Sequence, residues 1–152
     1  MRRVCVQAGA FDPGAELARL EALGGGAVAS FTGLVRGDGG LVEMRLDHYP
    51  AMTTRAMEAI AGEAEGRWPL IGLTVIHRYG PLVPGDRIVF VGTASSHRAA
   101  ALESCAFLID WLKTSAPFWK LERFADGREI WVEAKVEDDA AASRWRTGGH
   151  PG

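Results

Sequence analysis

Hydrophobic and polar residues alternate along much of this chain, and short stretches with a period of two are typical of half-buried strands. The stretches with this pattern lie at residues 3–7, 27–35, 41–49, 73–79, 87–93, 118–124 and 128–134. A glycine-rich turn at 37–40 separates the second and third stretches, so we expect these two to form a β-hairpin. The turn at 125–127 predicts that the last two strands are also neighbours.

Three other stretches show the spacing of amphipathic helices. The first begins at Asp12 and Pro13, because Asp is a favoured N-cap and Pro a favoured first helical residue. The second is expected at 53–67 and the third at 97–113, where apolar residues recur every three or four positions. Strands and helices are mixed without a regular βαβ alternation. This order predicts one α+β domain over residues 1–146, followed by a frayed tail at 147–152.

The composition narrows the class of protein. The chain of 152 residues carries 17 basic and 19 acidic side chains, and its net charge of −2 argues against a general nucleic-acid binder. Hydrophobic residues make up 47% of the chain, which is enough for a folded core. No apolar run is long enough to cross a membrane, and the two cysteines form no C-x-x-C pair. We therefore expect a soluble cytoplasmic protein that binds neither a membrane nor nucleic acid.

The common motifs of nucleotide-binding, zinc-protease and serine-hydrolase sites are absent from the sequence. The four histidines lack the spacing of metal ligands, so neither a metal nor a cofactor is expected. The basic residues are unevenly divided, with 14 arginines and only three lysines: Lys113, Lys120 and Lys135. A lysine can supply a neutral amine for chemistry, whereas an arginine stays protonated.

Lys113 and Lys120 flank a chain reversal at Pro117. If this reversal brings the two amines together, each disfavours the charged form of the other, and a neutral amine becomes available. The alternative is two separate surface lysines, with Lys113 only complementing the negative end of the helix dipole. The spacing alone leaves both interpretations open.

Two further clusters are candidates for binding an anion. Residues 95–98 (Ser-Ser-His-Arg) lie where a strand meets the third helix, and a serine cap, the helix N-terminus and Arg98 would suit a phosphate. The alternative is an ordinary helix cap with a solvated arginine, and these four residues by themselves favour it. Arg36 follows the strand that carries Phe31 and adjoins the glycine-rich turn, where a ligand could approach closely. The alternative there is an exposed arginine that protects a strand edge from aggregation.

Several stretches of the chain, taken together and in order, resemble one known family. They are Ala29–Arg36 (ASFTGLVR), Leu46–Met52 (LDHYPAM), Val75–Gly80 (VIHRYG), Pro84–Asp86 (PGD), Ser96–Arg98 (SHR), Leu112–Lys120 (LKTSAPFWK) and Trp131–Ala134 (WVEA). From about Val4 to Trp145 the chain resembles the large, catalytic subunit of molybdopterin synthase, the MoaE family.

The resemblance implies an α+β fold of the α/β-hammerhead type, with a mixed or antiparallel sheet and one long central helix. It also implies a homodimer within a heterotetramer. Each large subunit of the family binds a small ubiquitin-like sulfur carrier (MoaD-like), whose C-terminal Gly-Gly carries a thiocarboxylate. The enzyme is a sulfurtransferase of molybdenum cofactor biosynthesis, which adds two sulfurs to cyclic pyranopterin monophosphate (precursor Z) to form the dithiolene of molybdopterin.

The lysines of this chain fall on family positions. Lys113 and Lys120 match the two lysines essential for sulfur transfer, and the resemblance places Lys113 nearest the C-terminus of the carrier. Lys135 stands where the family often has an arginine that reaches the site of the other subunit. A lysine at this position keeps the charge but lacks the planar fork of an arginine.

The resemblance also assigns roles to four other residues. Arg36, His97 and Arg98 match positions that bind the phosphate and the pterin, and Phe31 matches a pocket residue. The alternative function is a non-catalytic module that binds a phosphorylated metabolite or the tail of a partner. The intact pair of Lys113 and Lys120 favours the enzyme.

Overall fold

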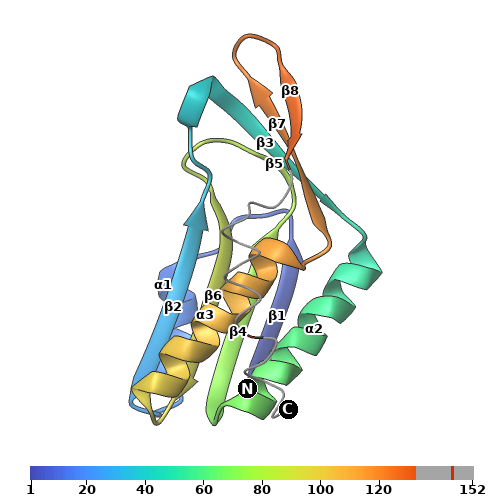
Figure 1. Cartoon of the computed structure of the whole chain (residues 1–152). Coiled ribbons are helices and arrows are strands. Elements are labelled where there is room, and N and C mark those ends of the chain that lie inside the picture. The colour runs from blue at the N-terminus through green and yellow to red at the C-terminus, as the bar shows by residue number, and fades with distance from the viewer. Residues whose placement is uncertain (133–144, 146–152) are drawn as a thin grey trace.

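A computed structural model describes residues 1–132 and Trp145, and it mixes strands with helices along the chain (Figure 1). The strands are β1 (Arg2–Gln7), β2 (Ala27–Leu34), β3 (Leu41–His48), β4 (Leu70–Arg78), β5 (Gly80–Leu82), β6 (Arg87–Ser95), β7 (Phe118–Phe124) and β8 (Glu129–Val132). The helices are α1 (Pro13–Glu21), α2 (Pro50–Arg67) and α3 (Arg98–Thr114), with a short 3-10 segment η1 (Asp38–Gly40). The predicted α+β class is confirmed. The predicted tail at 147–152 lies outside the described residues.

The strands form two four-stranded sheets. The first has the order β1-β4-β6-β2, in which β1 and β4 are parallel and the other pairs are antiparallel. The second has the order β5-β3-β7-β8 and is antiparallel throughout. The predicted pairing of the last two strands is confirmed, because β7 and β8 are neighbours around the turn that joins them.

The predicted hairpin between residues 27–35 and 41–49 is wrong. β2 pairs with β6 in the first sheet, whereas β3 pairs with β7 in the second, where Leu46 is in register with Lys120. Alternation of side chains predicts that a segment is a strand, but it carries no information about which strand lies beside it.

The crossing between the sheets occurs directly after β2. Val35 remains held by the neighbouring turn, because its N–H donates to Asp86 O and its carbonyl accepts from Gly85 N, both at 2.9 Å. The chain then passes through Gly39 and Gly40, whose φ angles of +64° and +83° favour glycine over any other residue. The glycine-rich stretch therefore moves the chain to the second sheet instead of turning it back along β2.

The first sheet is covered on both faces. Helices α2 and α3 lie on one face and α1 on the other (Figure 1). Along β4, Leu73 and Val75 enter the larger core beneath α2 and α3, whereas Ile76 packs with Leu20 and Phe90 beneath α1. Within residues 1–132, no helix is long and apolar enough to cross a membrane.

The predicted helix starts are correct in one case and need revision in two. Asp12 caps α1, and its side chain accepts a hydrogen bond from Gly14 N–H at 2.9 Å. α2 begins at Pro50, three residues before the predicted start at Thr53, because proline suits the first turn of a helix. A serine cap on α3 is wrong: the N-cap is His97, which makes no capping bond with its side chain.

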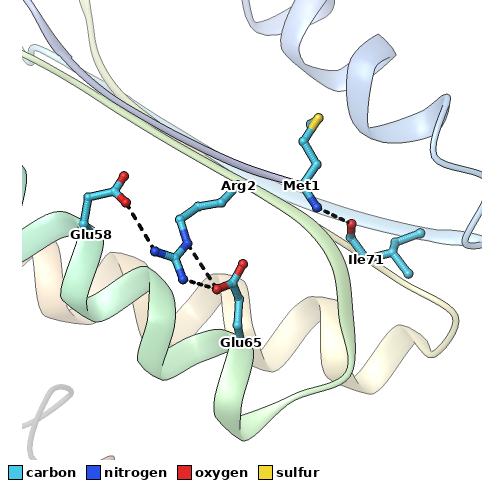
Figure 2. A network of polar contacts seen from close by, with 5 residues as sticks. All are labelled: Met1, Arg2, Glu58, Glu65 and Ile71. Atoms are coloured by element: carbon cyan, nitrogen blue, oxygen red, sulfur yellow. Dashed lines mark hydrogen bonds and ion pairs between the residues drawn. The ribbon is translucent and has the colours of Figure 1, made fainter.

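Two consecutive arginines tie β1 to different helices, because successive residues of a strand point to opposite faces. Arg2 contacts Glu58 and Glu65 of α2, and all three side chains are about one-third or more exposed (Figure 2). Arg3 holds Glu16 of α1 through two bonds, with Nε 2.9 Å from Oε1 and Nη2 3.2 Å from Oε2. The side chain of Glu16 is only 7% exposed, so its carboxylate depends on this arginine.

We expect Arg3→Ala to lower the free energy of unfolding by about 2–3 kcal/mol, because the buried carboxylate of Glu16 loses its partner. Arg2→Ala is the matched control and should cost about 1 kcal/mol or less, since water already screens its ion pairs. Urea unfolding measures both values. Adding Glu16→Leu to Arg3→Ala should recover part of the loss, and equal losses in the two single variants would contradict the argument.

Candidate functional site

The turn between α3 and β7 brings two lysines to one corner of the molecule. Ser115 N–H donates to Trp111 O at 2.8 Å, which closes the last turn of α3, and β7 begins three residues later. Lys113 lies in that last helical turn, where its charge complements the helix dipole, and Lys120 is the third residue of β7. We call the segment 113–120 the lysine corner.

A buried histidine lies beneath the lysine corner. His77 is 7% exposed, and its pKa falls to about 4, first of all because burial disfavours the charged ring. The hydrogen bond between Nδ1 and Arg78 O, at 2.8 Å, opposes this fall in pKa. The charges of Lys120, Lys113 and His48 lower the pKa further. The charges of both lysines therefore act on the same buried imidazole.

Aromatic rings surround this histidine. The ring of His77 stacks on Phe118, with 3.9 Å between centroids and 17° between planes. His48 lies near the same ring, with centroids 5.5 Å from Phe118 and 4.5 Å from Tyr79. Its Nδ1 is 3.1 Å from Thr53 Oγ1, and partial burial lowers the pKa of His48. The start of β7 therefore packs, through Phe118, against the uncharged rings of His77 and His48.

Phe31 and Arg36 lie on β2 and just beyond its end. A Cβ at Gly33 would lie 2.6 Å from Val89 Cγ1 and 3.2 Å from Phe31 Cε1, so the glycine leaves the room that the Phe31 ring occupies. Arg36 is exposed and pairs with Asp38 at 3.3 Å. In Figure 1, β2 and α3 end at the same end of the first sheet, which is the end that carries the lysine corner.

His97 and Arg98 lie at the opposite end of α3 from Lys113. Both are exposed and start α3, whereas Lys113 lies in the last turn of the same helix. At 1.5 Å per residue, the 15 steps from Arg98 to Lys113 span about 22 Å. Within the described residues, Lys113 and Lys120 flank one turn and both act on His77, whereas about 22 Å of helix separates Arg98 from Lys113.

One predicted site residue lies beyond the described part of the chain, and His48 and His77, whose rings lie near Phe118, are not among the predicted residues. Lys135 falls outside the described residues. The sequence nevertheless carries a signal for His77. Residues 73, 75 and 77 share one face of β4, and this face is otherwise apolar, so a histidine there is a polar residue in the core.

One hollow in the described part of the chain lies away from the lysine corner. This hollow of about 630 Å³ is lined by Phe11, Thr32, Leu34, Arg78 and Arg87, among others, and it contains none of the predicted site residues. Within residues 1–132 and Trp145, no three His, Cys, Asp or Glu side chains gather as metal ligands would. Cys105 is buried, which raises the pKa of its thiol to about 11 and leaves it unreactive.

Comparison with known proteins connects this geometry to one family. The model of the family described as "MoaE protein" matches residues 6–115, which is more than half of the chain. The chain belongs to the MoaE family. The molybdopterin synthase catalytic subunit of Pseudomonas aeruginosa is 54% identical over 145 residues, covering 92% of this chain and 96% of that protein.

Solved structures of the MoaE family have the same fold. The molybdopterin biosynthesis MoaE protein from Burkholderia ambifaria superposes with a TM-score of 0.81 at 49% identity, covering 95% of this chain and 98% of the other. A structure from Helicobacter pylori, described as a protein–protein complex of subunits 1 and 2 of molybdopterin-converting factor, superposes with a TM-score of 0.73. At 22% identity, over 87% of this chain and 91% of the other, it shows the fold alone.

The low pKa of His77 has a consequence for stability. The folded protein keeps His77 neutral down to about pH 4, whereas the unfolded chain takes up a proton below its ordinary pKa of 6.5. The stability that His77 contributes is therefore lost as the pH falls from 6.5 toward 4. Between pH 7 and pH 5 we expect the wild type to lose roughly 2 kcal/mol more than His77→Phe. Urea unfolding at the two pH values measures this difference, and parallel losses would show that His77 titrates normally.

Proposed function

We propose that this chain is the catalytic subunit of a molybdopterin synthase, a sulfurtransferase of molybdenum cofactor biosynthesis. It transfers sulfur from the thiocarboxylated C-terminus of a small sulfur-carrier subunit to cyclic pyranopterin monophosphate. The observation that carries the proposal is the lysine corner, where the charges of Lys113 and Lys120 both act on one buried, neutral imidazole. Membership of the MoaE family and the 54% identity to a named catalytic subunit supply the reaction.

The chemistry requires groups of this kind. Each transfer forms a carbon–sulfur bond to the side chain of the pterin, where a carbon–oxygen bond breaks. Water then cleaves the sulfur from the carrier, whose C-terminus is left as a carboxylate, and during these steps protons move and negative charge develops. One amine of the lysine corner acts as the acid or base, and the other holds the anionic thiocarboxylate. An arginine could hold the anion but could not exchange the proton at neutral pH, which explains why lysines stand at these positions in an arginine-rich chain.

The anionic substrate also requires basic residues that hold its phosphate. Arg36, at the end of the sheet nearest the lysine corner, is exposed and offers a planar fork of donors. Phe31 of β2 would line the path of the substrate to the lysine corner, and Gly33 leaves room for its ring. Lys135 would reach the site of the other subunit as a point charge.

His97 and Arg98 can take part in the proposed site only if they come from a second copy of the chain. About 22 Å of helix separates Arg98 from Lys113, so these basic residues do not reach the lysine corner of their own chain. A homodimer that places the start of α3 from one copy beside the lysine corner of the other would complete the site twice. The full assembly is then a heterotetramer, with one sulfur carrier bound to each large subunit.

The partner is a small protein with a flexible Gly-Gly C-terminus. The name "catalytic subunit" borne by the relatives implies at least one other subunit, and the related structure from Helicobacter pylori is described as a complex of two. A Gly-Gly tail can enter a narrow active site because it has no side chains that would clash with the walls. We place the reaction in the cytoplasm, where thiols such as those of Cys5 and Cys105 stay reduced.

Replacing either lysine should nearly abolish product formation without unfolding the chain. Lys113→Ala and Lys120→Ala remove the amine that exchanges the proton or holds the thiocarboxylate, so we expect the rate to fall at least 100-fold. Incubation with thiocarboxylated carrier and precursor Z, followed by mass spectrometry of the pterin product, measures this loss. Lys113→Arg and Lys120→Arg, which keep the charge, tell the two roles apart. Wild-type rates in both alanine variants would instead favour a non-catalytic binding module.

Mixing two inactive variants tests the shared site. If Lys120 and Arg98 act in one site but come from different copies, a dimer of Lys120→Ala with Arg98→Ala contains one intact site and one doubly altered site. Random assembly should then restore roughly a quarter of the wild-type activity. Each variant alone serves as the control. No recovery in mixed dimers, demonstrated by differently tagged chains, would show that both residues act within one chain or that Arg98 is not required.

A further inference from the structure

Two segments that the proposed chemistry leaves without a role meet at the start of β7. His48 and Tyr49 belong to the segment 46–52, and His77 and Tyr79 belong to the segment 75–80. The rings of His77 and His48 both lie against Phe118, and the ring of Tyr49 meets Trp119 edge-on at 4.9 Å between centroids. Aromatic and histidine rings from three distant parts of the chain thus pack together at the start of β7.

The closest ring contact of this group involves a residue next to Lys120 on the same face of β7. Phe118 and Lys120 are two residues apart in β7, so their side chains leave the same face of the strand. Phe118 is stacked at 3.9 Å and nearly parallel on His77, whereas the ring of His48 is tilted by 32° and lies farther away. The position and orientation of the Lys120 side chain therefore depend on the ring that packs against Phe118.

The ring of His77 is also held in one orientation. A carbonyl oxygen can only accept a hydrogen bond, so in the 2.8 Å contact with Arg78 O the hydrogen is on Nδ1. A neutral imidazole then carries no hydrogen on Nε2, and burial keeps the ring neutral at physiological pH. A charged ring at this place would repel both lysines, whereas a neutral flat ring supports Phe118 at no electrostatic cost.

We propose that His77 is a positioning residue for the lysine corner: its stacked ring holds Phe118, and through it the start of β7, so that Lys120 meets the reacting groups in a fixed orientation. This inference rests on the proposed role of Lys120 in sulfur transfer. His77 itself touches neither the carrier nor the substrate, and it exchanges no proton in the reaction. A displaced amine would slow the chemical step while leaving the binding surfaces intact.

Two matched substitutions separate the stacked ring from the mere filling of the core. His77→Phe keeps a flat ring under Phe118, and His77→Leu fills a similar volume without one. Both leave Arg78 O without its donor, so this loss cancels in the comparison. We expect His77→Leu to lower kcat at least tenfold, with KM for the carrier and the pterin changed less than twofold. His77→Phe should keep kcat within threefold of the wild type.

A second set of variants tests whether the effect passes through Phe118. Phe118→Leu should resemble His77→Leu, and the double variant should lose little beyond either single change, because both remove the same contact. Ile76→Val is the control for stability: Ile76 is fully buried next to His77 in β4, but it faces the other core. It should lower the unfolding midpoint and leave kcat unchanged.

The outcomes distinguish this inference from the proposed function. If Lys120→Ala is inactive while His77→Leu keeps the kcat of the wild type, Lys120 acts without the support of His77, and the positioning role is overturned. Equal losses in His77→Phe and His77→Leu would also overturn it, because the stacked ring would not be what matters. If Lys120→Ala remains fully active, the assignment of the lysine itself fails, whatever the His77 variants do.

Discussion

The antiparallel pairing of β4 with β6 is the constraint from which the position of the site follows. Both strands lie inside the first sheet and are covered on both faces, so most of their residues are buried. α3 leaves the far end of β6 and returns along the sheet, and this brings its own C-terminus back to the end where β4 finishes (Figure 1). Lys113 reaches the neighbourhood of His77 for this reason, although 36 positions separate them in the sequence. The turn at Pro117 then has to place only Lys120.

The sequence predicts the elements of this fold much better than it predicts their partners. The period of two in residues 27–35 and 41–49 correctly indicates strands, and the capping pair Asp12 and Pro13 correctly indicates the start of α1. The hairpin failed because the glycines at 39 and 40 permit a crossing between sheets as readily as a tight turn. Which of the two occurs depends on β6 and β7, which lie some 50 to 80 residues further along the chain.

The sequence likewise predicts only part of the candidate site. The chain reversal at Pro117 makes an approach of Lys113 and Lys120 plausible from local spacing alone, since only six residues lie between them. His77 could not be linked to them in this manner, because its contact with Phe118 joins strands of different sheets. The separation of Arg98 from Lys113 was available from the sequence, since a helix from 97 to 113 already fixes it. This separation becomes informative only once the structure places the lysine corner and Arg98 at opposite ends of the first sheet.

α3 therefore fixes the distance between the two basic clusters that are proposed to act in the site. An insertion or deletion of one residue between Arg98 and Lys113 would shift one end by 1.5 Å along the axis and rotate it by about 100°. The side chains that seal the core, such as Cys105 and Leu108, would rotate out of register at the same time. A change in the length of α3 would therefore disturb the core and the spacing of both basic clusters at once, whereas a change in the length of an exposed turn, such as the one between β7 and β8, would disturb neither.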